Sequence, residues 1–324
     1  MSATRQANAT DFDQLCQRLS NWGRWGESDE LGTLNFITEG KIAAAAKLVR
    51  RGTVFSLAVP FDEKGPQSGG LRINPIHTML KSGADIAAGT YARDFQGGND
   101  RAMKATDDMI VMPLQCCTHW DALGHIMYRD RMYNGYPASV VTSRGATKGD
   151  IAKTRKAFVG RGVLLDVARW LGHEPGPHEP IGGDQLDECA KAQGVKVGSG
   201  DILLIRTGRM ARVAAEGWNG YDNVAAGQSG IGVESVAWLH EKEIAAVAVD
   251  TLTAEAMPSE VPGVFLPVHI ATIVYMGLLL GEIFDLEALA TDCASDGVYE
   301  FQLVAAPLPF TGAVGAPLNP IAIK

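Results

Sequence analysis

Short, almost entirely apolar runs alternate with helical patterns through the second half of the chain. The runs have the length of strands, but they lack the alternation of polar and apolar residues that a half-exposed sheet requires. The expected strands are 162–168, 201–207, 244–250 and 298–306. The expected helices are 184–193, 234–241, 269–280 and 286–290. Buried strands joined by helices form parallel pairs, so the sequence predicts an α/β fold.

The first fifty residues have a different pattern. Phe12, Leu15 and Leu19 recur at helical spacing, and Thr38 is placed to cap a further helix that ends before Gly52. A strand is expected at 53–60, followed by long loops over 62–100 around a short element at 76–80. We therefore predict an N-terminal helical arm at 1–52 and a single domain at 53–324, since no linker divides the rest.

Two imidazoles and a carboxylate lie within seven residues in the middle of the chain, at His119, Asp121 and His125. On an extended chain, His119 and Asp121 project from the same face with Cα atoms about 6.6 Å apart, so both side chains can reach one metal ion. His125 needs a bend to join them and is better suited to move a proton. A His–Asp hydrogen bond without a metal explains the spacing equally well.

Gln115 adds a geometric condition to this segment. A straight strand from Gln115 to Asp121 would span about 20 Å, far more than the ligands of one ion can bridge. Pro113 argues against a continuous helix through the segment. If Gln115 takes part, the chain must therefore turn between Gln115 and His119.

Charge and composition exclude several functions. The net charge is −8 and no basic cluster is present, which disfavours nucleic acid as a partner. The apolar run at 261–281 contains Pro262, Pro267 and His269, so we expect a loop and a buried helix rather than a membrane span. Five irregularly spaced cysteines, and a polar start at 1–13, indicate a cytoplasmic protein with reduced thiols.

The segment 115–125 resembles the motif His-x-Gly-Thr-His-x-Asp-x-Pro-x-His of the cyclase family of metal-dependent hydrolases. That family includes bacterial kynurenine formamidase, isatin hydrolase and some lactone hydrolases. The matching residues are Thr118, His119, Asp121 and His125. The departures are Gln115 for the first His, Cys117 for Gly and Leu123 for Pro. The family also has a His near the start of a late helix that is followed about a dozen residues on by a Glu, and His269 and Glu282 are similar to this pair. The tail at 312–323 also resembles the family.

The resemblance implies a swivelling β/β/α-type single domain with mixed sheets flanked by helices. It also implies a divalent ion, Zn or Mn, held by Gln115, His119, Asp121 and His269. His125 would be the general base, and Glu282 would orient the attacking water or bind a second ion. An amide oxygen is a weaker zinc donor than imidazole, so a position of Gln115 outside the ligand set stays open. The family's dimers imply a homo-oligomer, a dimer or a tetramer.

The expected activity is hydrolysis of a small amide, lactam or lactone by metal-activated water. The alternatives are a metal-dependent lyase or dehydratase acting on a small carbonyl compound, and a non-catalytic protein that binds a metal or ligand. His77, Trp120 and Trp25 are candidates for the substrate pocket, although a loop position for His77 and core packing for the tryptophans explain them as well. The motifs of serine hydrolases and dinucleotide enzymes are absent from the sequence.

Overall fold

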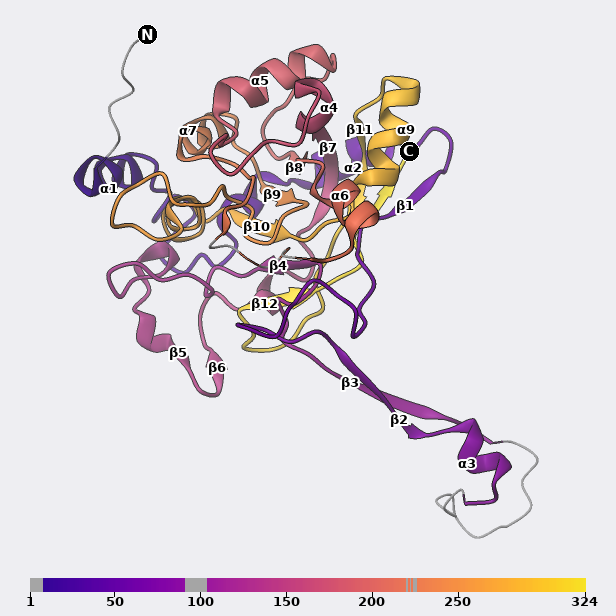
Figure 1. Ribbon diagram of the computed structural model, residues 1–324. Coiled ribbons are helices and arrows are strands. Elements are labelled where there is room, and N and C mark those ends of the chain that lie inside the picture. The colour runs from indigo at the N-terminus through magenta and orange to yellow at the C-terminus, as the bar shows by residue number, and fades with distance from the viewer. Residues whose placement is uncertain (1–7, 91–103, 220, 222, 224–225) are drawn as a thin grey trace.

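A nine-stranded mixed sheet forms the centre of the protein (Figure 1). The computed structural model describes residues 8–90, 104–219, 221, 223 and 226–324. The strand order is β1-β13-β11-β7-β8-β9-β10-β4-β12, in which β7 to β10 are parallel and the other pairs antiparallel. The strands are β1 (Val54–Ser56), β4 (His119–Asp121), β7 (Val159–Asp166), β8 (Ile202–Arg206), β9 (Ala246–Val249), β10 (Leu279–Glu282), β11 (Glu300–Val304), β12 (Gly315–Pro317) and β13 (Ile321–Ile323). The prediction of an α/β domain with mixed strands is confirmed.

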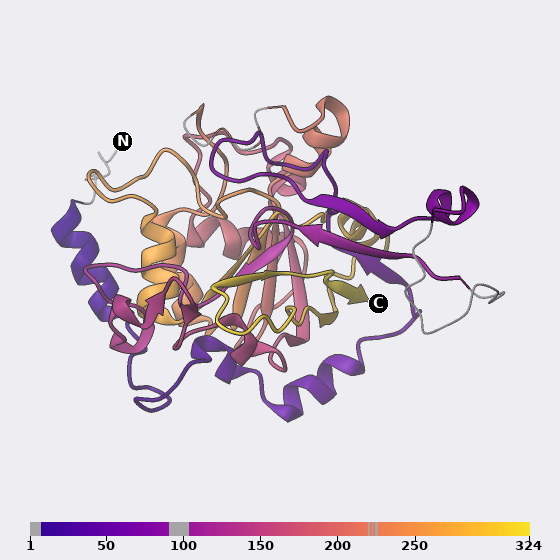
Figure 2. The ribbon, with the colours of Figure 1, turned by 90° about the horizontal axis from the view of Figure 1, so that it is seen from below.

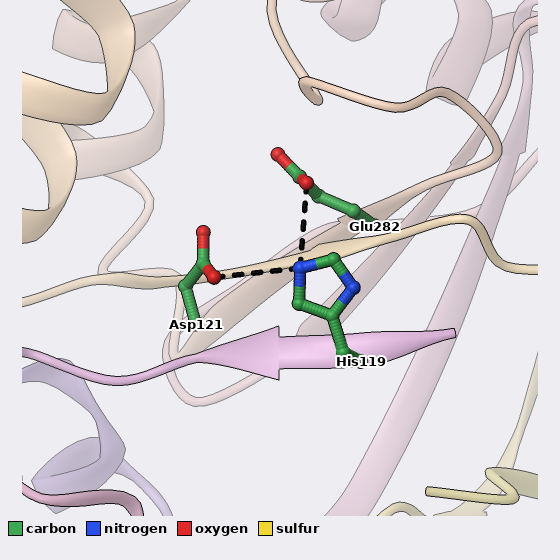
Figure 3. Close-up of side chains that lie close together, drawn as sticks. All are labelled: His119, Asp121 and Glu282. Carbon is green, nitrogen blue, oxygen red and sulfur yellow. Dashed lines mark ion pairs between the residues drawn. The ribbon is translucent and has the colours of Figure 1, made fainter. Parts of the chain in front are cut away.

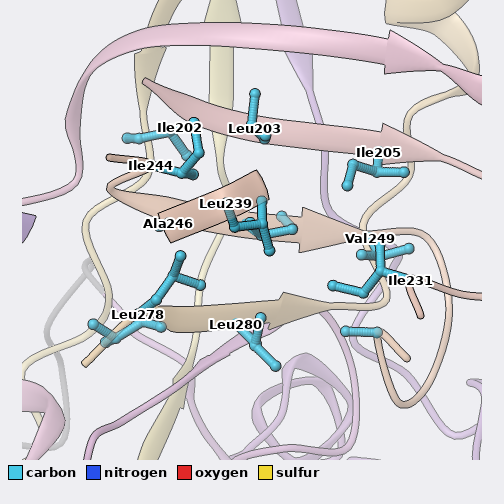
Figure 4. Packing of buried hydrophobic residues seen from close by; sticks show 14 of the residues in the cluster. Ile202, Leu203, Ile205, Ile231, Leu239, Ile244, Ala246, Val249, Leu278 and Leu280 are labelled. Atoms are coloured by element: carbon cyan, nitrogen blue, oxygen red, sulfur yellow. The ribbon is translucent and has the colours of Figure 1, made fainter. Parts of the chain in front are cut away.

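The parallel strands are buried on both faces, which explains their nearly continuous apolar sequences. Every residue of β9, and all of β8 except Arg206, is buried. Figure 4 shows side chains of β8, β9 and β10 packed with Leu239 of α7 (Val233–Glu241). The other helices that follow these strands are α4 (Val167–Leu171), α5 (Gly183–Ala192), α6 (Arg209–Glu216) and α9 (Glu287–Asp296). Their positions agree with the layering expected from the sequence.

The N-terminal segment folds as three short helices, α1 (Ala9–Arg18), η1 (Gly32–Phe36) and α2 (Glu39–Ala46). The Thr38 side chain accepts a hydrogen bond from the backbone of Lys41, so the predicted cap of α2 is confirmed. Helix α2 packs against β7 and β11, and α1 packs against the π-helical segment η6 (Ile270–Met276). The described part of the arm therefore lies on the body of the protein.

The predicted helix at 269–280 is wrong at its end. It begins as α8 (Pro267–His269), continues as η6 and stops at Gly277, whose φ is +69°. A Cβ at that position would lie 2.4 Å from the Tyr133 ring, so only glycine fits the turn. The chain then enters β10, which puts Glu282 on a strand. Within the described residues, no helix has the length and apolar character needed to cross a bilayer.

A two-stranded hairpin extends away from the body (Figures 1 and 2). It pairs β2 (Ile76–Lys81) with β3 (Asp107–Val111) and carries α3 (Gly83–Ala87) near its tip. The short element predicted at 76–80 is β2, and residues 91–100 of the predicted loop lie outside the described residues. The remaining short elements are β5 (Val141–Thr142), β6 (Gly145–Ala146), η2 (Tyr133–Gly135), η3 (Ala138–Val140) and η4 (Ile151–Thr154).

Candidate metal centre

Strand β4 sorts the side chains of the central motif onto two faces. The chain turns over residues 114–118, as a contribution from Gln115 would require, and then runs extended from His119 to Asp121. His119 and Asp121 are two residues apart and share one face. Trp120, between them, points into the opposite layer, where it stacks on Phe158. One face of β4 therefore builds the core and the other builds a polar centre.

Strand β10 brings a third group to the same face. It pairs antiparallel with β4, with Glu282 directly opposite His119, and side chains of directly opposed residues lie on one face. Gly281 makes this close pairing possible, because a Cβ there would lie 2.6 Å from the Trp120 ring. Thr118 adds a cross-link by donating to the Ile283 carbonyl at 2.5 Å. Residues more than 160 positions apart in the chain are thereby held in fixed register.

The side chains converge on one buried point (Figure 3). The Nε2 atom of His119 lies 3.4 Å from Oδ1 of Asp121 and 3.4 Å from Oε2 of Glu282. His269, at the start of the late helix, brings its Nε2 to 3.2 Å from Oε1 of Glu282 and 3.9 Å from Oδ2 of Asp121. All four side chains are at least 96% buried. The sequence prediction that the middle segment and His269 meet is in agreement with this geometry.

Each of the two histidines is oriented through its other ring nitrogen. Nδ1 of His119 lies 2.7 Å from the Cys117 carbonyl oxygen, which can only accept a hydrogen bond. Nδ1 of His269 lies 2.5 Å from Oε1 of Glu255, a buried carboxylate that also accepts from the backbone N–H groups of Val268 and His269. Such contacts turn Nε2 toward the shared point, as carbonyl and carboxylate partners do for metal-binding histidines.

Glu255 was missed by the sequence analysis. The only signal for it is a charged residue inside the apolar stretch Ala254–Met257, where an unpaired glutamate would be costly to bury.

The electrostatics of the centre favour a bound cation. Burial raises the pKa of Glu282, but its contacts with His119 and His269 outweigh burial and leave the pKa below its usual value. The pKa of Asp121 is also held low, because His125 and His119 counteract the effect of burial. Burial lowers the pKa values of His119 and His269, yet the facing carboxylates raise them to about 9 and about 10. The two carboxylates are therefore ionised and attract positive charge, which protonated imidazoles or a bound cation can supply.

A divalent metal ion fits these residues. Nε2 of His119 and Oδ1 of Asp121 are buried without a hydrogen-bond partner among the described residues, and such orphaned atoms are rare in folded proteins. One ligand atom each from His119, Asp121 and Glu282 lie within 4.8 Å of one another. Ligands about 2.0–2.2 Å from a zinc ion are separated by up to roughly 4.4 Å, so little adjustment is needed. Mixed imidazole and carboxylate donors suit zinc and manganese.

The centre opens into a pocket of about 700 Å³, within the range of small-molecule sites of about 300–1,000 Å³. Asp121, His269 and Glu282 form its floor. His125 lies on the wall after a turn at 123–124, with Nε2 3.6 Å from Oδ1 of Asp121 and the side chain 23% exposed. Burial is the main reason that the pKa of His125 is lowered. His125 therefore lies beside the polar centre and in contact with the pocket.

Comparison with known proteins agrees with the resemblance read from the motif. The model of the Cyclase family matches residues 53–256, well over half of the chain. The chain belongs to the cyclase family. A crystal structure described as a novel cyclase is 41% identical, with a TM-score of 0.84, over 94% of this chain and 99% of that one. A search among curated proteins gave no match.

Solved structures of lower sequence identity share the fold. Isatin hydrolase A from Ralstonia solanacearum is 19% identical with a TM-score of 0.59, over 89% of this chain and 98% of that one. Isatin hydrolase A from Labrenzia aggregata is 19% identical with a TM-score of 0.55, over 86% of this chain and 94% of that one.

Gln115, which replaces the first histidine of the cyclase motif, lies beside the centre. A Cβ on Gly315 would meet the Gln115 amide nitrogen at 2.6 Å. Gly315 pairs directly with Asp121, so that Cβ would project from the same face of the sheet as the Asp121 side chain. The amide of Gln115 therefore fills the space that the missing side chain of Gly315 leaves next to Asp121.

The three residues considered for the substrate pocket are not brought to it. His77 is on the extended hairpin, 53% exposed and paired with Asp108 at 2.8 Å. Trp25 packs edge-on against Phe36 in the N-terminal arm. Trp120 is fully buried and donates to the Ala305 carbonyl, so its ring is part of the core. The described pocket lining consists instead of Gln67, Ser68, Gly70, Leu71, Arg72, Asp121, His125, Ile126, Asn223, Leu252, Thr253, Phe265, Leu266, His269 and Glu282.

Proposed function

We propose that this cyclase-family protein is a metal-dependent hydrolase that opens or cleaves a small amide, lactam or lactone. The main support is the pair of buried ligand atoms, His119 Nε2 and Asp121 Oδ1, which have no hydrogen-bond partner among the described residues and converge with Glu282 and His269 at the floor of a pocket. The names of the isatin hydrolases among its structural neighbours add support, because isatin is a cyclic amide.

His119, Asp121 and His269 would hold the ion, as predicted from the sequence, and Glu282 would join them. Gln115 stands next to Asp121 as a further candidate ligand. A bound zinc or manganese ion would polarise the substrate carbonyl and lower the pKa of water. Glu255 and the Cys117 carbonyl hold the two imidazoles in orientation.

Proton transfer would be the role of His125. Its Nε2 reaches the pocket from the wall, next to the floor that would receive the carbonyl carbon of the substrate. That nitrogen would accept a proton from the attacking water and later return it to the leaving nitrogen or oxygen. General base catalysis of this kind contributes on the order of 10²–10⁴ in rate.

The test combines metal analysis with a panel of carbonyl substrates. Purified protein should contain at least one Zn or Mn per chain and should hydrolyse at least one of isatin, N-formylaniline or an unsaturated lactone. Oxygen from ¹⁸O-labelled water should appear in the product, which a lyase or dehydratase reaction would not produce. A folded protein that holds no metal would refute the proposal.

We also propose that the protein is a cytoplasmic homo-oligomer. All five cysteines are free thiols, in keeping with a reducing compartment. Ile76 and Val111 are opposed on one face of the β2–β3 hairpin and are 53% and 52% exposed, and Met109 on that face is 46% exposed. An isolated two-stranded hairpin is only marginally stable in water. Packing against a second copy of this chain would bury the apolar face and stabilise the hairpin.

Light scattering coupled to gel filtration measures the oligomeric state. The wild type should have a molar mass of two or four times 34.5 kDa. Ile76→Lys should lower that mass, whereas Val298→Lys, at a position 44% exposed outside the hairpin, should not. A wild type of 34.5 kDa would contradict the oligomer.

A further inference from the structure

One wall of the pocket is a loop that is tied to the turn preceding the metal centre. Gln67 donates through its side-chain amide to the Cys116 carbonyl at 2.7 Å. The side chain of Asn74 bridges the backbone N–H and carbonyl of Gln67, at 2.9 and 2.8 Å. Arg72 donates through Nη1 to the Gln115 carbonyl at 2.8 Å. These bonds hold residues 67–72 over the centre, with Arg72 lining the pocket.

Among the arginines that the structure describes, Arg72 differs from the other partly buried ones in having no carboxylate partner. Arg161 is paired with Asp201 and Glu300, and Arg206 with Asp166 and Glu287. Across the described part of the chain, no acidic side chain forms an ion pair with Arg72, which is half-buried and bonded to a neutral carbonyl oxygen. Burying a guanidinium in part without a counter-charge is unfavourable. A ligand that brings the counter-charge would remove this cost.

The other charged side chains of the pocket, within the described residues, belong to the floor or stand beside it: Asp121, His125, His269 and Glu282. With a divalent ion bound, the charges of the two carboxylates are balanced, and Arg72 is left as the unbalanced charge of the wall. The rest of the wall is largely apolar, with Leu71 and Phe265 90% and 69% exposed at these positions. The pocket thus offers a polar floor, apolar sides and one cation.

We propose that Arg72 binds a carboxylate of the substrate, so that the protein acts on acidic amides, lactams or lactones with an apolar body. The inference rests on the proposed function and adds a substrate class to it. A guanidinium can donate two parallel hydrogen bonds to a carboxylate, which gives both affinity and orientation. Leu71, Leu266 and Phe265 would contact the apolar part of the molecule.

A purely structural role for Arg72 predicts a different result. If Arg72 only ties the loop to the Gln115 carbonyl, its replacement would disturb charged and neutral ligands alike. If Arg72 binds a carboxylate, its replacement would lower the affinity for the charged ligand and leave the affinity for the neutral ligand nearly unchanged. The two roles are therefore distinguished by the ratio of the affinity for a charged ligand to the affinity for a neutral ligand, measured for each variant.

The experiment is calorimetric titration of the metal-loaded protein with the three isomers of aminobenzoate and with aniline. These are products of formamide hydrolysis and undergo no turnover, so binding is measured whether or not the protein hydrolyses formanilide. At least one aminobenzoate should bind the wild type about tenfold or more tighter than aniline, as a charge-assisted hydrogen bond provides. Arg72→Gln should abolish that preference, and Arg72→Lys should restore part of it.

Arg131→Gln is the matched control. Arg131 also donates one hydrogen bond from Nη1 to a backbone carbonyl, that of Gly135 at 3.0 Å, but it is not among the pocket residues. This variant should keep the preference of the wild type. The inference is overturned if the wild type binds no aminobenzoate better than aniline. It is equally overturned if Arg72→Gln keeps the preference, or lowers the affinities for aniline and aminobenzoate by the same factor. A failure to hydrolyse any of isatin, N-formylaniline and an unsaturated lactone would count against the proposed function alone.

Discussion

Replacing Glu255 by glutamine should weaken metal binding without removing any proposed ligand. Glu255 is 1% exposed and accepts three hydrogen bonds, from Nδ1 and the backbone N–H of His269 and from the backbone N–H of Val268. Glutamine has nearly the same shape but carries no charge and only one acceptor oxygen. If that oxygen keeps the bonds to His269, the new NH₂ group faces the Val268 N–H, donor against donor.

The size of the effect follows from what Glu255 does to the imidazole. Loss of a carboxylate that orients a metal-binding histidine typically costs 10–100-fold in metal affinity, which corresponds to about 1.4–2.8 kcal/mol. A buried donor without an acceptor costs a further 1–3 kcal/mol, approximately, in the free energy of unfolding. We therefore expect a folded protein with a lower Tm and a dissociation constant for Zn²⁺ raised by at least tenfold.

In the assay, the metal-free protein competes for Zn²⁺ with a chelator of known affinity, and circular dichroism checks that each variant is folded. Glu260→Gln is the control, because Glu260 also accepts a backbone N–H, from Val233 at 2.6 Å, but within the described part of the chain it forms no hydrogen bond or ion pair with the four residues of the centre. A Glu255→Gln protein that binds Zn²⁺ within twofold of the wild type would refute the role given to this carboxylate.

Three further outcomes are expected. His125→Ala should lower kcat by at least about 10²-fold while metal content stays unchanged; metal loss in this variant would make His125 a ligand instead. Gly281→Ala should destabilise the fold by about 1–3 kcal/mol, because the added methyl meets the Trp120 ring, whereas Gly83→Ala, with open space around it, should not lower the Tm in the same denaturation experiment. Removing metal with a chelator should lower the Tm, and adding back Zn²⁺ at about 100 times its dissociation constant should restore roughly 2.7 kcal/mol of stability; an unchanged Tm would contradict binding to the folded state.

Local sequence patterns were sufficient to predict the central strands and part of the candidate site. Uninterrupted apolar runs marked β7, β8 and β9, and the two-residue spacing of His119 and Asp121 put both on one face of β4. The resemblance to the cyclase motif added His269. The apolar run that contains β10 does not distinguish a helix from a strand by its composition, so the turn at Gly277 was not found.

What sequence reasoning missed depends on contacts between distant segments. Glu282 was predicted as a site residue, but its place opposite His119 follows from the pairing of β10 with β4. Glu255 was not predicted, and it faces His269 only because its loop packs beside the late helix. Trp120 was a candidate for the pocket because it lies between two site residues, but alternation along a strand turns it away from them. Arg72 reaches the pocket through a hydrogen bond to Gln115, forty-three positions later.

The pairing of β4 between β10 and β12 has a consequence for how this protein can diversify. Three of the proposed ligands are positioned by backbone ladders, whereas much of the pocket wall comes from connecting segments such as 67–72 and 252–253. Lengthening or rewriting those segments would change which molecules enter and leave the ion-binding geometry as it was. The proposed ion-binding residues and much of the pocket wall thus lie in different parts of the chain, so that substrate choice can change through the wall with the strands kept.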